Sequence, residues 1–299
     1  MNATSSLDDY LRDRYAPATA RLYAYEIGRY LDRCGGEAVA RRAGYADLVR
    51  HLAELRRRHP RPGTLKRILS AIKAYYRYLV ATEQRADLPG EGLRLRDVDR
   101  PGIQHQDLLT DAELAALLAE RPERYAGLRH RNRTIVGLLV HQALTQGELS
   151  RLRVPDVDLA AATLRVPATR QTLARTLPLT AGQILPLQTY LATERPALLR
   201  QPTDHLLLTQ RGTAERGEGI RHLVQTLRPR VADKRLTPTV IRESVIAQRL
   251  RKGEDLRHVQ AFAGHKYVST TEGYRESQLA ELRRGVARYH PLDAGEPKS

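Results

Sequence analysis

Three residues in the last quarter of the 299-residue chain have side chains suited to phosphate chemistry: Arg242, His265 and Tyr274, separated by 23 and 9 positions. A guanidinium can bind two phosphate oxygens at once, an imidazole can transfer protons, and a tyrosine hydroxyl can act as a covalent nucleophile. Residues of each type also have ordinary structural roles. The chain contains 14 tyrosines and 10 histidines, so the residue type alone does not mark a site. The significance of these residues therefore depends on the motifs around them.

The charge balance indicates a polyanionic partner. Lys and Arg together number 50 against 34 Asp and Glu, which gives a formal net charge of +16. Nucleic acid is the usual partner of so basic a protein, although a basic protein without such a partner would have the same composition.

A basic helix face lies in the first hundred residues. The periodic segments 18–33, 46–58 and 64–81 are predicted to be helices, each with an apolar face. The other side of the third segment carries basic residues that could follow DNA phosphates, and a merely solvated face is the competing interpretation. These basic residues are Lys66, Arg67, Lys73 and Arg77.

Two domains joined by a linker are expected. Residues 1–87 form a helical domain, residues 88–107 a linker with several Gly and Pro, residues 108–292 a second domain, and residues 293–299 a disordered tail. The second domain contains a predicted capping box at Thr110. It also contains further helices, one of them over 181–194, and a hairpin of strands 163–167 and 175–179. The fold class is mainly α with a small antiparallel β-sheet (α+β).

The cysteine and hydropathy patterns indicate a reducing, aqueous compartment. Cys34 is the only cysteine, so no internal disulfide can form and no cysteine cluster is available for a metal. The sequence has no apolar signal region and no apolar run of about 18 residues. We expect a cytoplasmic, nucleoid-associated protein without a membrane partner.

Four segments match the pattern of a known family in the right order. They are HQALTQGELSRLRVPDVDL (141–159), VPATRQTLARTLPL (166–179), LTPTVIRESVIAQRL (236–250) and AFAGHKYVSTTEGY (261–274). The chain resembles the tyrosine recombinases, or phage integrases, over roughly residues 8–280. The resemblance implies a helical SAM-like core-binding domain followed by a catalytic domain, which together form a C-shaped clamp on DNA.

The resemblance also implies a reaction. In this family a tyrosine attacks the scissile phosphate, which gives a 3′-phosphotyrosyl link and a free 5′-hydroxyl without a metal or other cofactor. It assigns the nucleophile to Tyr274 and phosphate-side roles to Arg242 and His265. It places Arg170 and Arg175 of the hairpin near DNA, in addition to the basic helix face.

Three family positions are substituted. Thr145 stands where the first catalytic arginine is expected, Arg170 replaces a lysine, and Thr239 replaces a histidine. In other enzymes, the loss of one preorganised hydrogen-bond donor lowers the rate about 10²- to 10³-fold. Arg170 is a poor proton donor because the pKa of an arginine lies above about 12. Threonine cannot replace an imidazole as an acid or base. Arg151 or Arg175 could substitute for the arginine missing at position 145.

These substitutions leave three functions open. We expect a DNA-binding member of a bacterial, mobile-element type of site-specific recombination system (integration, excision or resolution) whose own cleavage by Tyr274 is weak or absent. The alternatives are an active recombinase with a modified site and a DNA-binding regulator without recombination. The expected partner is double-stranded DNA at a specific site, bound by a homo- or hetero-oligomer (a tetramer) in which an intact recombinase could take part. Residues 277–290 would dock on a neighbouring subunit or on their own domain.

Overall fold

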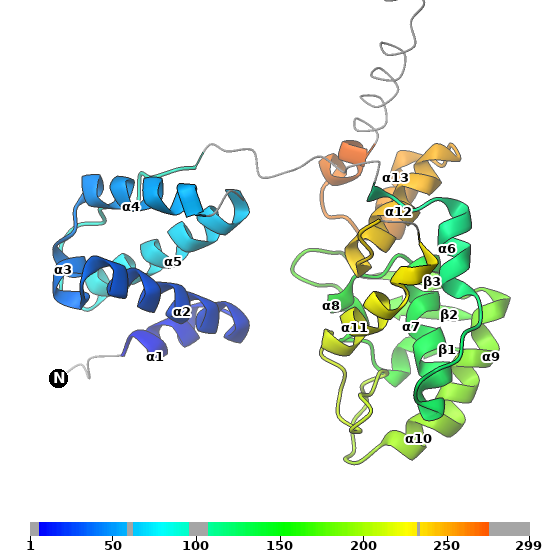
Figure 1. Ribbon diagram of the computed structural model, residues 1–299. Coiled ribbons are helices and arrows are strands. Elements are labelled where there is room, and N and C mark those ends of the chain that lie inside the picture. Colours follow the sequence, from blue (N-terminus) through cyan, green and yellow to red (C-terminus); the bar gives the residue numbers. More distant parts are fainter. Residues whose placement is uncertain (1–5, 59–61, 96–106, 232–233, 275–299) are drawn as a thin grey trace, which may run out of the picture. The chain divides into compact units, whose positions relative to one another are not determined.

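The computed structural model describes residues 6–58, 62–95, 107–231 and 234–274. The chain divides into two compact units, Met1–Pro101 and Gly102–Ser299 (Figure 1). The predictions for 277–290 and 293–299 lie outside the described residues. Within the described ranges, no helix is long and apolar enough to cross a membrane.

The N-terminal unit is helical. Its described elements are α1 (Leu7–Arg14), α2 (Pro17–Cys34), α3 (Glu37–Arg42), α4 (Tyr45–Arg58) and α5 (Pro62–Ala81). The helices α2, α4 and α5 confirm the three predicted segments. Gly35 ends α2 in the left-handed region, with φ 85°, where a residue without Cβ is favoured.

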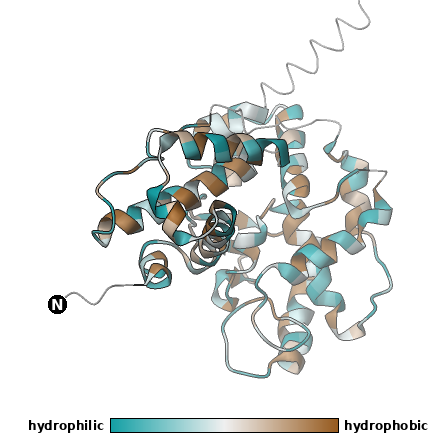
Figure 2. Cartoon of the chain, turned by 60° about the vertical axis from the view of Figure 1, so that its left-hand side comes forward, coloured by the Kyte–Doolittle hydropathy of each residue, from teal (hydrophilic) through white to brown (hydrophobic). Residues whose placement is uncertain are grey.

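Helix α5 packs against α1, α2 and α4 and provides much of the core. Its apolar face is buried, including Leu65, Ile68, Ile72, Tyr75 and Leu79. Tyr76 donates a hydrogen bond to the carbonyl of Ala40 at 2.8 Å, and its hydroxyl lies 2.6 Å from that of Tyr30. This buried chain links α2, α5 and α3. Figure 2 shows the hydrophobic and hydrophilic sides of the helices in both units.

The start of the predicted linker is packed. Leu93 is buried among the core residues of the helical unit, and a Cβ added at Gly90 would lie 3.1 Å from a methyl carbon of Leu48. At the other end, Leu108 is buried in a cluster of the C-terminal unit. Residues 88–95 therefore pack with the helical unit, because their apolar side chains find a surface that the Gly and Pro content does not reveal.

The C-terminal unit combines helices with a small sheet. Its helical elements are α6 (Asp111–Leu118), η2 (Ala126–Leu128), α7 (Arg129–His141), α8 (Gln146–Leu149), η3 (Val154–Asp156), α9 (Ala181–Thr189), η4 (Tyr190–Glu194), α10 (Arg195–Leu198), α11 (Glu218–Thr226), η5 (Arg228–Arg230), α12 (Pro238–Arg251) and α13 (Leu256–Ala263). Helix α7 packs against α6, α9, α11 and α12 and so forms the centre of this unit (Figure 1).

The sheet and the first helix of this unit follow the predicted pattern. Strands β2 (Thr163–Val166) and β3 (Arg175–Pro178) pair antiparallel, with Leu164 opposite Leu177, and β1 (Val157–Asp158) adds a short third strand. The hydroxyl of Thr110 accepts from the backbone of Glu113, whose carboxylate accepts from the Thr110 amide. The predicted fold class, mainly α with a small antiparallel sheet, is confirmed.

One predicted helix is divided. The segment 181–194 consists of α9 followed by the π-helical turn η4. The carboxylate of Glu194 accepts hydrogen bonds from the amides of His130 and Arg131, both at 2.9 Å, and thereby satisfies donors at the start of α7. Periodicity could not predict this wider turn, because the contact that accompanies it is made with a helix 64 residues away.

Candidate active site

A pocket of about 530 Å³ in the C-terminal unit brings together five of the six predicted catalytic positions, all except His265. Residues from the α8 turn, the β2–β3 loop, α12 and the end of the described chain line it: Thr145, Gln146, Gly147, Arg151, Thr169, Arg170, Gln171, Thr172, Pro238, Thr239, Arg242, Glu243 and Tyr274. The lining thus includes Arg242, Tyr274 and all three substituted positions. His265 and Arg175 do not line the pocket, but His265 stacks on Tyr274 and Arg175 pairs with Glu148.

Tyr274 is held by apolar packing. Its side chain lies in a buried cluster with Leu108, Ile246, Val259 and other residues, and only 7% of the residue is exposed. Burial raises the pKa of the phenol above its ordinary value, the charge of Glu243 raises it further, and Arg242 partly opposes the shift. At neutral pH the hydroxyl is therefore protonated, and an attack on phosphorus needs an acceptor for its proton.

His265 lies beside this phenol. The two rings are stacked, with centroids 6.2 Å apart and planes inclined by 14°, and Nδ1 of His265 is 2.8 Å from Oγ1 of Thr271. Burial, together with the charges of Arg242 and Arg175, lowers the pKa of His265 to about 4. The imidazole is therefore neutral at pH 7, and its lowered pKa makes it a weak proton acceptor.

Arg242 is fixed on α12 by backbone carbonyls. Its Nη1 donates to the carbonyl of Ala143 and its Nη2 to that of Ala263, both at 2.6 Å. The guanidinium also lies 3.8 Å from the carboxylate of Glu148. Burial lowers the pKa of Arg242, but a guanidinium remains charged in proteins. The group is thus a positioned cation at the pocket wall.

Glu148 organises the site beneath the pocket. One of its carboxylate oxygens accepts from Arg175 at 2.6 Å and from the hydroxyl of Thr172 at 2.8 Å. The other accepts from the amide of Thr145 at 2.8 Å and from its hydroxyl at 3.0 Å. Burial disfavours ionisation, but the bond from Arg175 and the charges of Arg175 and Arg242 outweigh it and hold the pKa of Glu148 below its usual range.

The substituted residue Thr145 serves as a helix cap. Its hydroxyl oxygen accepts from the amide of Glu148 at 3.1 Å, as the N-cap of α8. Its one hydroxyl proton goes to the Glu148 carboxylate, and a hydroxyl has no second proton to donate. Thr145 therefore has no donor left for a phosphate oxygen in this arrangement.

Arg175 lies inside the unit. Its side chain is 6% exposed and forms the ion pair with Glu148, whereas its Nε and Nη2 have no hydrogen-bond partner in the described part of the chain. Gly264, at φ 68°, packs so closely that an added Cβ would lie 2.6 Å from Nη1 of Arg175. This close approach explains why a glycine precedes His265. The predicted DNA contact by Arg175 stays a prediction, and its burial does not favour it.

The loop that carries Arg170 is attached to the turn after α13. The amide of Leu173 donates to the carbonyl of Gly264, and Nζ of Lys266 donates to the carbonyl of Arg170, both at 2.8 Å. Arg170 itself is exposed. Sequence reasoning missed Lys266, because only the docking of the loop brings its ammonium group beside residue 170.

Glu243 was also missed. It lines the pocket next to Arg242, and burial raises its pKa despite the opposing charge of that arginine. Its position directly after a predicted phosphate-binding arginine was the available signal. A carboxylate at this wall would oppose the approach of an anion, so the protonation state of Glu243 changes the charge of the pocket.

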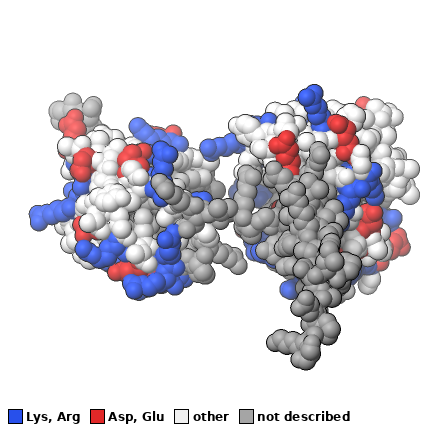
Figure 3. Space-filling model, turned by 90° about the horizontal axis from the view of Figure 1, so that it is seen from above, with Lys and Arg blue, Asp and Glu red and all other residues white. Residues whose placement is uncertain are grey.

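The predicted basic face of α5 contains cations that already have partners. Lys73 donates to the carbonyls of Glu91 and Leu93, at 3.0 and 2.8 Å, and Arg77 pairs with the Glu91 carboxylate at 2.6 Å. Lys66 lies half-buried on the same helix. Figure 3 shows Lys and Arg side chains spread over the visible faces of both units, with Asp and Glu among them.

Arg67, beside this face, pairs with Glu26 of α2 at 2.9 Å. That carboxylate is only 4% exposed, while the arginine side chain is 44% exposed. DNA contact by these four residues stays a prediction.

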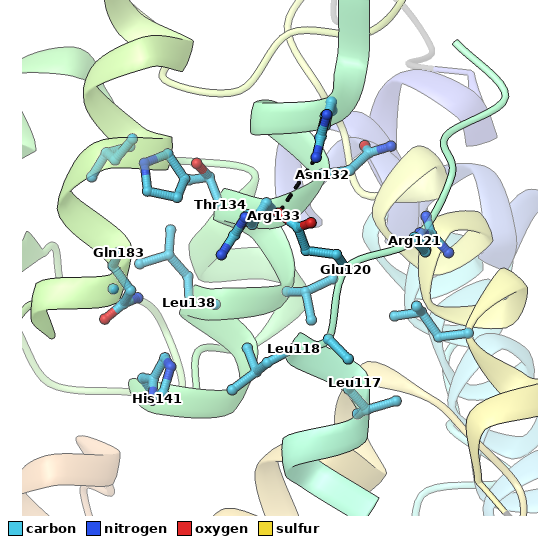
Figure 4. A pocket seen from close by; sticks show the side chains of 18 of the residues that line it. Leu117, Leu118, Glu120, Arg121, Asn132, Arg133, Thr134, Leu138, His141 and Gln183 are labelled. Carbon is cyan, nitrogen blue, oxygen red and sulfur yellow. Dashed lines mark hydrogen bonds and ion pairs between the residues drawn. The ribbon is translucent and has the colours of Figure 1, made fainter. Parts of the chain in front are cut away.

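A second cavity, of about 250 Å³, lies among α6, α7 and α9 (Figure 4). Leucines such as Leu117 and Leu138 line it together with Gln183, and Glu120 and Arg133 also belong to its wall. None of the predicted site residues belongs to it. Among the described residues, no group of three or more His, Cys, Asp or Glu could hold a metal ion.

Comparisons with known proteins agree with this architecture. Residues 107–281 match the phage integrase family, and residues 6–83 match the SAM-like N-terminal domain of phage integrases. The tyrosine recombinase XerD of Staphylococcus epidermidis is 30% identical over 231 residues, which are 76% of each chain. The tyrosine recombinase XerA of Thermococcus kodakarensis is 30% identical over 274 residues, 90% of this chain and 88% of the relative.

Solved structures share the fold at lower identity. The XerH recombinase bound to its difH substrate after cleavage is 18% identical, with a TM-score of 0.68, over 90% of this chain and 78% of that one. A lambda integrase dimer bound to a core site is 16% identical, with a TM-score of 0.64, over the whole of both chains. The fold is thus one that also occurs in recombinases solved with DNA.

Proposed function

Because the chain belongs to the phage integrase family of tyrosine recombinases, we propose that it is a DNA-binding member of a site-specific recombination system whose own strand cleavage through Tyr274 is weak. One observation carries this proposal: Tyr274 and Arg242 line the same pocket as the three substituted positions. A preserved nucleophile and one preserved phosphate-binding group thus stand beside Thr145, Arg170 and Thr239, which activate a phosphate poorly.

The proposed reaction uses the residues of this pocket. The Tyr274 oxygen forms a bond to phosphorus, its proton passes to an acceptor, and the bond from phosphorus to the 5′ oxygen breaks. We propose that His265, neutral and stacked on Tyr274, accepts this proton, and its lowered pKa makes it a weak base. The departing 5′ oxygen must gain a proton, and neither Arg170 nor Thr239 is a suitable acid. Departure of this oxygen is therefore the slow step.

A second candidate is a binding subunit without cleavage. It is favoured by the Thr145 hydroxyl, whose proton is donated to Glu148 and not to the pocket. In both cases we propose that the protein works as an oligomer on a specific duplex. This proposal extends the solved lambda integrase dimer on its core site to the present chain.

A covalent trapping experiment separates the candidates. A duplex site is selected from a random library by repeated binding, and a nick near its centre lets the cleaved fragment diffuse away. Slow formation of a protein–DNA adduct by the native chain, absent in Tyr274→Phe, supports the proposal. Specific binding with no adduct supports the binding subunit, and the absence of any specific binding overturns both.

A modified leaving group tests the slow step. Replacing the bridging 5′ oxygen by sulfur gives a leaving group that departs without a proton, because thiols ionise near pH 8.5. We expect the native chain to form its adduct much faster on this substrate. Arg170→Lys supplies an acid of lower pKa and should accelerate cleavage of the oxygen substrate only. Equal rates on both substrates would show that leaving-group protonation is not limiting.

A further inference from the structure

We propose that Arg151 takes over the role of the arginine missing at position 145 and contacts the scissile phosphate together with Arg242. The inference rests on the proposed function, since it names a further residue of the same site. Its basis is that Arg151 lines the Tyr274 pocket. No described residue forms a hydrogen bond or ion pair with its guanidinium, which can therefore bind a phosphate.

The position of Arg151 follows from the short helix α8. Thr145 caps this helix, and Arg151 lies in the turn after it, where its amide donates to the carbonyl of Glu148. The guanidinium extends back along the helix, because a Cβ added at Gly147 would lie 3.8 Å from its Nη1. Thr145, Gly147 and Arg151 all line the same pocket, so the guanidinium belongs to the wall from which the missing side chain would extend.

The availability of Arg151 distinguishes it from its neighbours. Within the ranges that the structure describes, its side chain has no hydrogen bond or ion pair with another residue. Arg175, the other candidate from the sequence, is buried and paired with Glu148. Arg153, two residues further on, pairs with Asp204 at 2.6 Å. An arginine without a carboxylate partner in a concave site favours an anion.

The chemistry requires a cation at this place. Charge builds on the non-bridging oxygens as the Tyr274 oxygen approaches phosphorus, and a second guanidinium stabilises that charge. The planar fork of arginine can donate two hydrogen bonds to one phosphate. Arg151 forms and breaks no covalent bond, so its role does not depend on the missing acid. Glu243 is the one carboxylate that the described residues contribute to the lining, and it does not pair with Arg151.

A binding experiment tests the contact independently of cleavage. In the Tyr274→Phe background, the selected duplex is prepared with a single neutral methylphosphonate at each successive position. With Arg151 present, neutralising the scissile phosphate should weaken binding about tenfold, the scale of a charged hydrogen bond. In Arg151→Ala the ordinary duplex should bind about tenfold more weakly, and the methylphosphonate at that position should cause a smaller loss than in the presence of Arg151, because only Arg242 then still meets the phosphate.

Two matched variants control for the position and the charge of the residue. Arg153→Ala removes a cation from the same segment but not from the pocket, and should keep the native positional profile. Arg151→Lys keeps the charge without the fork and should recover part of the affinity. If Arg151→Ala keeps the native profile, or weakens binding equally at every position, the proposal is overturned.

A kinetic experiment separates this inference from the proposed function. Where the native chain forms the adduct, Arg151→Ala should slow it about 10²- to 10³-fold on phosphate and much less on the methylphosphonate. An equal slowing on both substrates would overturn the role of Arg151. If the native chain forms no adduct, cleavage by this chain is refuted, while the binding profile still decides whether Arg151 contacts the phosphate.

Discussion

Two basic regions of this protein differ in whether their cations already have acidic or carbonyl partners within the protein. On α5, Lys73 and Arg77 are held by Glu91 and the carbonyls near it, at the surface of the helical unit. In the Tyr274 pocket, Arg151 faces the cavity without such a partner among the described residues. Helical spacing predicted that the α5 cations share one face, but only the fold reveals which cations lack a partner within the protein.

The ion pairs of the two regions also differ in strength. The Arg77–Glu91 pair is exposed on both sides, at 44% and 46%, whereas Arg175 and Glu148 are 6% and 0% exposed. An exposed pair contributes little and can exchange its carboxylate for a phosphate. A buried pair cannot, because either partner left alone would be an uncompensated charge in the interior. The exposed pair can thus exchange its carboxylate for another anion, and the buried pair holds the site rigid.

The largest predicted effect concerns the buried pair. Glu148→Ala leaves Arg175 without its carboxylate and should lower the free energy of unfolding by about 3–5 kcal/mol, as for other broken buried pairs. Glu91→Ala in the exposed pair should lower it by less than about 1 kcal/mol. Urea unfolding of both variants measures the contrast. Equal losses would show that burial does not separate the two regions.

A second prediction concerns pH. The unfolded state binds a proton at His265 near pH 6.5, whereas the folded state does so only near pH 4. Between these values the unfolded state binds more protons, so the free energy of unfolding falls as the pH falls. For this residue the loss from pH 7 to pH 5 is about 2 kcal/mol. In His265→Asn, urea unfolding should show a pH dependence smaller by that amount, and an unchanged dependence would contradict the burial of a neutral imidazole.

The third prediction tests the α5 face. Changing Lys66, Lys73 and Arg77 to Ala should weaken DNA binding and reduce the salt slope by about one unit for each phosphate that these cations neutralise in the native complex. The measurement is the affinity for the selected duplex over a range of salt concentrations. An unchanged slope would mean that these cations do not meet DNA phosphates.

The smallest predicted effect refines the comparison. Glu91→Gln removes the charge that neutralises Arg77 but keeps a side chain of similar shape. If the α5 face meets phosphates, DNA affinity should rise a few-fold, about 1 kcal/mol or less, because an exposed pair no longer competes with the backbone of DNA. Glu37→Gln, which breaks the exposed pair with Arg41 in α3, is the matched control. A similar rise in both variants would indicate a general charge effect.

The sequence by itself determined the elements and the chemical types. Apolar periodicity predicted α2, α4 and α5, the capping box and the hairpin, because these depend on residues close together in the chain. The four ordered motifs placed Tyr274 and Arg242 in one site and identified the substitutions at 145, 170 and 239. They could not show how side chains far apart in the chain share their hydrogen bonds.

Tertiary structure alone decided how these groups are used. Glu148 takes the Thr145 hydroxyl proton and the Arg175 charge, Glu194 accompanies a wider helical turn, and residues 88–95 occupy cations of α5. Each is an interaction between segments brought together by folding, and a buried polar group must find its partner wherever the fold provides one. Arg151 was one of two candidates in the sequence, and the burial of Arg175 separates it from the other.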